Sequence, residues 1–143
     1  MNKMSYPKVS IIIPVYNGSN YLKNAIECAL QQTYGNLEVL VVDDGSTDDG
    51  ATENIAMEYG DRIRYFKKPN GGVSSALNFG IQNMTGDYFS WLSHDDAYSN
   101  DKIKDSVDLL AEHKLIGEDA VAFTGGHFID SYGKVIRDFS VFF

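Results

Sequence analysis

The sequence contains one cysteine, Cys28, among 143 residues. A single thiol excludes an internal disulfide bond and a zinc site built from several cysteines. A chain without disulfides suits a reducing compartment. We therefore expect a cytoplasmic protein. For a longer form of it, we also expect peripheral association with the inner face of the plasma membrane.

Long hydrophobic runs are also absent. No apolar run approaches the roughly 20 residues that a membrane-spanning helix needs. The apolar residues 9–15 include Ser10 and Pro14, and no small-residue cleavage site follows them, which argues against a secretory signal. We predict instead that they form a buried strand.

Positive charge is scarce in the chain. There are 12 Lys and Arg residues against 20 Asp and Glu residues, which gives a formal net charge of -8. Proteins that bind nucleic acid carry a basic surface to neutralise phosphates, so this composition argues against a nucleic-acid partner. An acidic protein that binds an anionic ligand needs a local cation.

The apolar pattern alternates between strand and helix along the chain. It predicts an α/β fold, a Rossmann-like three-layer sandwich with helices on both faces of a mainly parallel sheet of core order 3-2-1-4. We expect one domain over residues 1–143, with Trp91 in its core. The predicted strands are residues 9–15, 37–42, 62–66, 87–92 and 120–124. The predicted helices run from residue 19 or 20 to 32, from Asp48 or Asp49 onward, over 71–84 and over 100–113, and a hairpin covers 127–137.

Adjacent carboxylates follow the fourth predicted strand, at Asp95 and Asp96. Two carboxylates at the end of a buried strand repel each other, and burial makes the repulsion stronger. A divalent cation with oxygen ligands is the usual compensation. We therefore predict a Mg²⁺ or Mn²⁺ site here, with an anionic ligand bound to the metal.

The first two predicted strands also end in residues that can bind a ligand. Tyr16 follows the first strand, and Asp43 and Asp44 end the second. Because ligands of open α/β sheets bind beyond the carboxyl ends of the strands, these residues are expected at one edge with Asp95 and Asp96. These features are typical of a nucleoside diphosphate site: an aromatic ring stacks on the base, an acid accepts the base N–H, and a metal binds the phosphates. No Walker-type or G-x-G-x-x-G loop is present.

A set of short motifs, in order along the chain, resembles family-two glycosyltransferases of the GT-A fold. The resemblance covers about residues 7 to 125. The motifs are VSIIIPVYN at 9–17, QQTY at 31–34, VDDGSTD at 42–48, NGGV at 70–73, ALNFGI at 76–81 and HDD at 94–96. The first position of the family's Asp-x-Asp motif is an acid, whereas this chain has His94 at that position.

The resemblance implies roles for individual residues. Tyr16 would stack on the base, Asp44 would accept its N–H, Asp95 would lie near the ribose, and Asp96 would bind Mg²⁺ or Mn²⁺ on the diphosphate, with Asp95 as the second metal candidate. The complete set of implied nucleotide-binding residues is Pro14, Tyr16, Asn17, Asp43, Asp44, Gly71, Gly72 and Asp95.

The implied activity is transfer of a sugar from a nucleotide-diphospho-sugar, with UDP as the expected nucleotide, to an acceptor hydroxyl with inversion. The expected acceptor is a glycan or a lipid-linked molecule, in the synthesis of bacterial cell-surface polysaccharide or glycan. A general base has no motif in this chain. We expect it beyond Phe143, in an acceptor-binding half of a longer protein.

Two other function classes remain open. A catalytically incomplete domain could bind nucleotide or a partner without chemistry, and the apolar residues 139–143 could then mediate self-association. A nucleotidyltransferase shares the layout but needs a basic, glycine-rich loop after the first strand, and residues 17–20 are not of that kind. Individually, the Asp43–Asp44 turn and the Gly71–Gly72 pair could simply begin helices.

Overall fold

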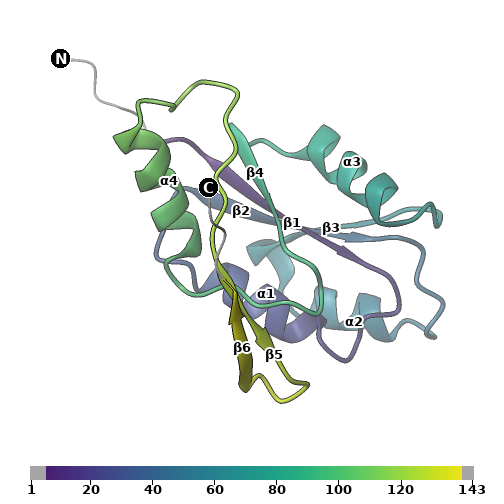
Figure 1. Cartoon of the computed structure of the whole chain (residues 1–143). Coiled ribbons are helices and arrows are strands. Elements are labelled where there is room, and N and C mark those ends of the chain that lie inside the picture. The colour runs from purple at the N-terminus through teal and green to yellow at the C-terminus, as the bar shows by residue number, and fades with distance from the viewer. Residues whose placement is uncertain (1–5, 140–143) are drawn as a thin grey trace. The chain divides into compact units, whose positions relative to one another are not determined.

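The structure is a computed structural model that describes residues 6–139. It divides into two compact units, with the boundary after Lys104 (Figure 1). The first unit contains a parallel sheet and its helices, and the second contains most of helix α4 and a hairpin. Among the described residues, no helix is long and apolar enough to cross a membrane.

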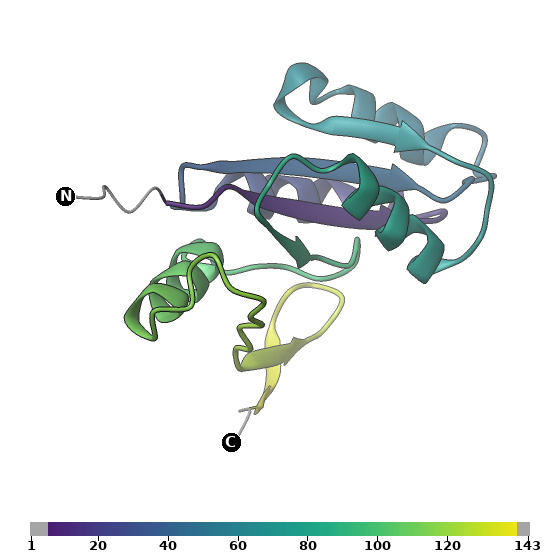
Figure 2. The ribbon, with the colours of Figure 1, turned by 90° about the horizontal axis from the view of Figure 1, so that it is seen from above.

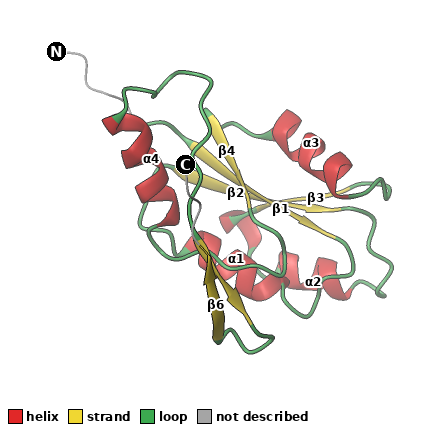
Figure 3. Cartoon of the chain, in the orientation of Figure 1, coloured by secondary structure: helices red, strands yellow, loops and turns green. Residues whose placement is uncertain are grey.

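Four parallel strands form the sheet of the first unit, in the order β3-β2-β1-β4 (Figure 3). The predicted 3-2-1-4 order is therefore confirmed. The register places Val15 opposite Asp43 and Asp43 opposite Lys67, so the carboxyl ends of three strands meet at one edge. The strands are β1 (Val9–Val15), β2 (Leu37–Asp43), β3 (Arg64–Lys67) and β4 (Tyr88–Trp91).

Helices cover both faces of this sheet, as predicted. Helix α3 (Val73–Asn83) lies on one side, and α1 (Leu22–Leu30) and α2 (Ala51–Met57) lie on the other (Figures 1 and 2). The side chains that α1 buries are at the i, i+3, i+4 and i+7 positions read from the sequence. They are Leu22, Ala25, Ile26 and Ala29.

The core packs β1 and β2 against helix α3. Every residue of β1 is buried, and Ile12 lies opposite Leu40 of β2. Together with Val42 and Ala76 they form a buried apolar cluster between the sheet and α3. Each large side chain buried in this way contributes about 1.5–3 kcal/mol. The strand ends that carry the polar residues are thus fixed by the packing behind them.

Some boundaries differ from the predictions for local reasons. Helix α1 begins at Leu22 because the Gly18 carbonyl accepts from both Tyr21 and Leu22, which closes a turn before the helix. Residues Gly60–Arg62 form a short 3₁₀ turn, so β3 starts two residues later than predicted.

The prediction that Trp91 lies in the core is wrong. Its residue surface is 52% exposed in the described structure, and that of Phe89 is 48% exposed. Strand β4 pairs only with β1 in the described sheet, so it is an edge strand. Because side chains alternate along a strand, Phe89 and Trp91 share the face of β4 that this structure leaves open.

The second unit contains the part of α4 (Lys102–Glu112) after Lys104 and a hairpin of β5 (Gly126–Ile129) and β6 (Val135–Phe139). The predicted hairpin is confirmed. Asp130 closes its turn, because Oδ1 accepts the N–H groups of Tyr132 and Lys134, each at 2.9 Å.

The predicted fifth strand at 120–124 is wrong. These residues are irregular, and Val121 and Phe123 are 74% and 60% exposed. A short apolar run predicts a strand only if a partner strand pairs with it, and the described sheets provide none for these residues. The apolar residues 140–143, and the side chain of Phe139, lie outside the described residues, so self-association through them stays a prediction.

Candidate functional site

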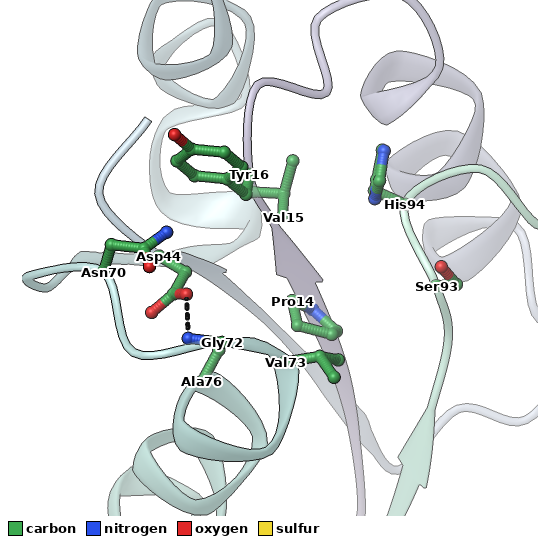
Figure 4. A pocket seen from close by; sticks show the side chains of 10 residues that line it. All are labelled: Pro14, Val15, Tyr16, Asp44, Asn70, Gly72, Val73, Ala76, Ser93 and His94. Atoms are coloured by element: carbon green, nitrogen blue, oxygen red, sulfur yellow. Dashed lines mark hydrogen bonds between the residues drawn. The ribbon is translucent and has the colours of Figure 1, made fainter. Parts of the chain in front are cut away.

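The carboxyl ends of β1 and β2, the residues after β4 and the start of α3 surround a pocket of about 340 Å³ (Figure 4). All of its lining residues belong to the first unit. They are Pro14, Val15, Tyr16, Asp44, Asn70, Gly72, Val73, Ala76, Ser93 and His94. This is the sheet edge at which the sequence places the ligand.

Tyr16 supplies an aromatic surface to the pocket. It directly follows the last residue of β1 and is 46% exposed, so its ring is fixed at one end and open to a ligand at the other. Pro14 and Val15 add apolar lining below it (Figure 4). A flat ring with an apolar floor suits the stacking of a planar group.

Asp44 places a carboxylate in the wall of the pocket. It is only 3% exposed, and its oxygens accept hydrogen bonds from three N–H donors. Lys68 Nζ lies 2.7 Å from Oδ1, the Gly72 N–H donates to Oδ2 over 2.7 Å, and the Gly71 N–H is shared between both oxygens at 3.1 Å. Figure 4 draws the bond from Gly72.

These contacts keep the Asp44 carboxylate ionised. Burial disfavours the charged form, but the Lys68 ammonium and the two glycine N–H groups outweigh it, so the pKa of Asp44 lies below its ordinary value. An ionised carboxylate can only accept hydrogen bonds. The pocket therefore offers an acceptor to any ligand group that carries an N–H or O–H.

The glycine pair Gly71 and Gly72 has a structural role as well as a place at the pocket. Gly72 has a φ of +87°, a left-handed conformation that favours glycine, and precedes the first residue of α3. The N–H groups of Gly71 and Gly72 both point at Asp44 rather than at the pocket centre. The loop is thus held against β2, and Gly72 contributes backbone lining.

Asp43 is better explained as a structural residue than as a nucleotide ligand. Its side chain has no exposed surface. Oδ1 accepts the Ser46 N–H and Oδ2 accepts the Tyr65 hydroxyl, each at 2.8 Å. It is not among the lining residues, so the structure uses it to fix the turn that presents Asp44.

Asn17 connects the ends of β1 and β2. Its N–H donates to Ser46 Oγ over 2.9 Å, and its Oδ1 accepts the Thr47 N–H over 2.7 Å. Asn17 has a φ of +49°, a conformation that asparagine tolerates better than most residues. It lies beside the pocket but does not line it, so its expected ligand contact stays a prediction.

Asp95 and Asp96 lie in a turn after β4 and are exposed. The prediction that they directly follow a buried strand is wrong: β4 ends at Trp91 and is only half-buried, and the Asp96 N–H donates back to the Ser93 carbonyl. The Ser93 hydroxyl donates to Asp95 and lowers the pKa of that carboxyl. Partial burial and the negative charge of Asp95 raise the pKa of Asp96.

The oxygen ligands at this turn are of the kind that Mg²⁺ and Mn²⁺ bind. Within residues 6–139, no group of three or more His, Cys, Asp or Glu side chains could hold a metal ion. Mg²⁺ is often bound by one or two carboxylates together with substrate phosphates. Two exposed, mutually repelling carboxylates fit a metal that is completed by a diphosphate.

The family follows from a comparison with known protein families. The family model described as Glycosyl transferase family 2 matches residues 10–138. The chain belongs to glycosyl transferase family 2. It is 57% identical, over 131 residues, to an uncharacterized glycosyltransferase of Rickettsia felis, a match that covers 92% of this chain and 21% of the relative. The chain therefore spans about a fifth of that relative's length.

Solved glycosyltransferase structures share the fold of this family 2 chain. S. aureus TarS 1-349 superposes with a TM-score of 0.68 at 27% identity, over 75% of this chain and 33% of the other. The mannosyltransferase PcManGT from Pyrobaculum calidifontis, in complex with GDP-Man and Mn²⁺, superposes with a TM-score of 0.66 at 27% identity, over 76% and 33%. The GT-A fold implied by the sequence motifs is confirmed.

The family 2 pocket includes residues that the sequence did not single out. Asn70, Val73 and Ala76 line it, and all three belong to motifs that carried the family resemblance. His94 was noted only as a departure at the metal motif, yet its side chain lines the pocket from the β4 side (Figure 4). Nothing in the sequence pointed to Lys68, because its contact with Asp44 joins residues 24 positions apart.

Proposed function

We propose that this chain is the nucleotide-sugar-binding part of a glycosyltransferase, which transfers a sugar from a nucleoside diphosphate to an acceptor hydroxyl. The observation that carries the proposal is the pocket in which Tyr16 and the ionised Asp44 face a common space at the end of the parallel sheet. Membership of glycosyl transferase family 2 supports it.

The base end of the donor lies, in this proposal, between Tyr16 and Asp44. The tyrosine ring stacks on the base, and Asp44 accepts its ring N–H. Uracil carries a ring N–H between two carbonyl groups, and guanine carries one between a carbonyl group and an amino group. Cytosine and adenine present a nitrogen lone pair at the equivalent ring position. A UDP-sugar is our first candidate, and the GDP-Man bound to PcManGT makes a GDP-sugar the second.

The phosphate end extends toward Asp95 and Asp96. Asp95 would lie near the ribose, and Asp96 would hold Mg²⁺ or Mn²⁺, with Asp95 as a second ligand. A bound divalent cation would neutralise the negative charge of the leaving diphosphate. PcManGT, which is similar in fold, is in complex with Mn²⁺. In this proposal Asp44 and Tyr16 orient the donor in the pocket, and Asp95 and Asp96, which follow the lining residues Ser93 and His94, add the metal-dependent part of its affinity.

Inversion requires a general base on the side of the sugar opposite the leaving group. Asp44 is the only carboxylate among the residues that line the described pocket, and its oxygens are already engaged by Lys68, Gly71 and Gly72. We place the base and the acceptor pocket in sequence beyond this chain. The proposal includes a glycan or lipid-linked acceptor and a role in bacterial cell-surface glycan synthesis. It also includes a cytoplasmic location with peripheral membrane association.

A nucleotide panel tests the proposal. The thermal unfolding temperature is measured with UDP, GDP, CDP and ADP, each with and without Mn²⁺. Ligands that bind the folded state raise this temperature. We expect UDP or GDP to give the largest increase and Mn²⁺ to enlarge it. Equal, negligible shifts with all four nucleotides would contradict the proposal.

A binding module without transferase activity is the second candidate. It is favoured by the same observation that the described pocket offers binding groups but no free carboxylate for proton transfer. An assay of sugar release from UDP-sugars separates the two. A longer protein that binds nucleotide but neither transfers nor hydrolyses the sugar would be such a module.

A further inference from the structure

Lys68 is a nearly buried cation that lies behind the base site. Its side chain is 13% exposed, and it follows β3 at the start of the loop that leads to α3. Its Nζ lies 2.7 Å from Asp44 Oδ1 and 2.6 Å from the Pro69 carbonyl oxygen. A lysine is rarely buried unless its charge is paired, so this placement indicates a specific use.

The hydrogen bonds of Asp44 show how much of the carboxylate remains for a ligand. A carboxylate has about four acceptor positions. Lys68 and Gly72 each take one at 2.7 Å, while the Gly71 N–H is divided between the two oxygens at 3.1 Å. The carboxylate is therefore fixed in orientation but can accept one more strong hydrogen bond.

We infer that Lys68 is the positioning residue of the base site: its ammonium holds the Asp44 carboxylate charged and in place, so that the pocket selects bases with a ring N–H. The inference rests on the proposed nucleotide-binding function. Lys68 acts through Asp44 and is not among the lining residues of the pocket.

The other charged and titratable groups around Asp44 do not replace Lys68. Asp43, its neighbour on β2, faces Ser46 and Tyr65 instead. Tyr16 and His94 line the pocket from the ends of β1 and β4. Without Lys68, only the N–H groups of Gly71 and Gly72 would oppose burial, so the neutral acid would become more favourable than it is in the unmodified chain. A neutral carboxyl carries an O–H donor, which suits the N3 lone pair of cytosine and not the N3–H of uracil.

Lys68→Met tests the inference against Lys67→Met. Lys67 is the neighbouring lysine, but its side chain is 42% exposed and pairs with Glu53 on the surface. Binding of UDP and CDP is measured by calorimetry from pH 5 to 8. We expect Lys68→Met to lose about tenfold in UDP affinity at pH 5.5 relative to pH 8, and to lose preference for UDP over CDP. Lys67→Met should match the unmodified chain at every pH.

Two further measurements and one replacement variant complete the test. Lys68→Arg, which retains the cation, should restore most of the UDP affinity at pH 5.5. In nucleotide-free protein, the Asp44 carboxyl ¹³C signal should titrate at higher pH in Lys68→Met than in Lys67→Met. If Lys68→Met does not fold, Lys68→Gln, which can still donate to Asp44, is used in both experiments.

The outcomes separate this inference from the proposed function. An unchanged Asp44 titration, or a Lys68→Met binding profile equal to that of Lys67→Met, would overturn the role of Lys68. A shifted Asp44 titration together with no nucleotide binding by the unmodified chain would support the coupling of Lys68 to Asp44. That result would overturn base selection and the proposed function.

Discussion

The Asp44 side chain has two tasks at the scale of single residues. It joins β2 to the loop that begins α3, through Lys68, Gly71 and Gly72. The same carboxylate faces the pocket. Removing it should therefore affect both the stability of the fold and the affinity for nucleotide, in amounts that can be measured separately.

Asp44→Ala is expected to lower the free energy of unfolding by about 2 kcal/mol, because it leaves buried donors without an acceptor. It should also weaken UDP binding by at least about tenfold while the response to Mn²⁺ remains. Urea unfolding and calorimetry give the two values. Asp61→Ala, an exposed position in the 3₁₀ turn, is the matched control. UDP affinity equal to that of this control would exclude Asp44 from the base site.

Asp96→Asn tests the other end of the site. It removes the charge of the proposed metal ligand but keeps the shape of the side chain, so we expect the increase in UDP affinity caused by Mn²⁺ to disappear. Metal-free UDP binding should change less than about twofold, because the neutral amide only relieves the repulsion from Asp95. Titration of UDP with and without Mn²⁺ measures both. A full Mn²⁺ response in the variant would rule out Asp96 as the metal ligand.

Among the secondary-structure elements, the turns and strand ends determine the geometry of the pocket wall. Gly45 has a φ of +77°, and a Cβ added there would lie 2.8 Å from the backbone nitrogen of Asn70. The β2 end and the loop after β3 can approach each other this closely only because residue 45 lacks a side chain. Gly45 thus helps to form the pocket wall without touching a ligand.

Gly45→Ala is expected to destabilise the chain by about 2 kcal/mol or more, from left-handed backbone strain and the displaced loop. It should weaken UDP binding as well, because Asn70 and Gly72 move with that loop. Gly35→Ala is the matched control, since a Cβ at residue 35 meets nothing within 4 Å. Equal stability of the two variants, measured by urea unfolding, would contradict this account of the loop.

Glu38 ties together the opposite, amino end of the sheet. Its carboxylate accepts from Ser10 of β1, from Arg64 of β3 and from the backbone and hydroxyl of Thr85. Burial opposes the charge, but these donors outweigh it and lower the pKa of Glu38 to about 2. The folded state therefore binds this proton less readily than the unfolded state does.

The sign of the pH dependence follows from that lowered pKa. The ionised Glu38 carboxylate stabilises the folded state fully at pH values above the Glu38 pKa in the unfolded chain, about 4.3. This stabilisation is lost as the pH falls from there toward 2. The amount is on the order of 3 kcal/mol. Glu38→Gln should remove this part of the acid sensitivity, as measured by urea unfolding between pH 2.5 and 6. An unchanged slope in the variant would assign the acid sensitivity to other groups.

Most elements of the first unit could be predicted from sequence because their patterns are local. Strand β1 is apolar throughout, and α1 repeats its apolar residues at helical spacing. Trp91 could not be placed correctly, because its exposure depends on the position of β4 at the sheet edge. The prediction of a strand at 120–124 is wrong for a similar reason, because a strand forms only where it pairs with residues far away in sequence.

At the scale of the whole molecule, the site follows from the sheet. Parallel order brings the ends of β1 and β2 together, so Tyr16 and Asp44 could be predicted as neighbours from the positions at which their strands end. The contact between Lys68 and Asp44 depends on the path of a loop. Asp43 and Asp44 are both buried, and which of them lines the pocket depends on the direction in which each side chain leaves the end of β2. Neither is encoded in a local pattern.

Donor binding and sugar transfer are separate parts of the proposed function. The chain spans 21% of the length of the Rickettsia felis relative, so the activity of the whole protein is part of the proposal. The described pocket supplies Tyr16 and Asp44 as groups for donor binding. Donor binding by this chain is therefore the step that a measurement can test first.

Calorimetric titration of the 143-residue chain with UDP, with and without Mn²⁺, measures whether the pocket binds a nucleotide donor. We expect saturable one-to-one binding that Mn²⁺ strengthens and Asp44→Ala weakens. GDP, which also carries a ring N–H, is titrated in parallel. Absence of binding to either nucleotide, with and without Mn²⁺, by protein shown to be folded would contradict the account.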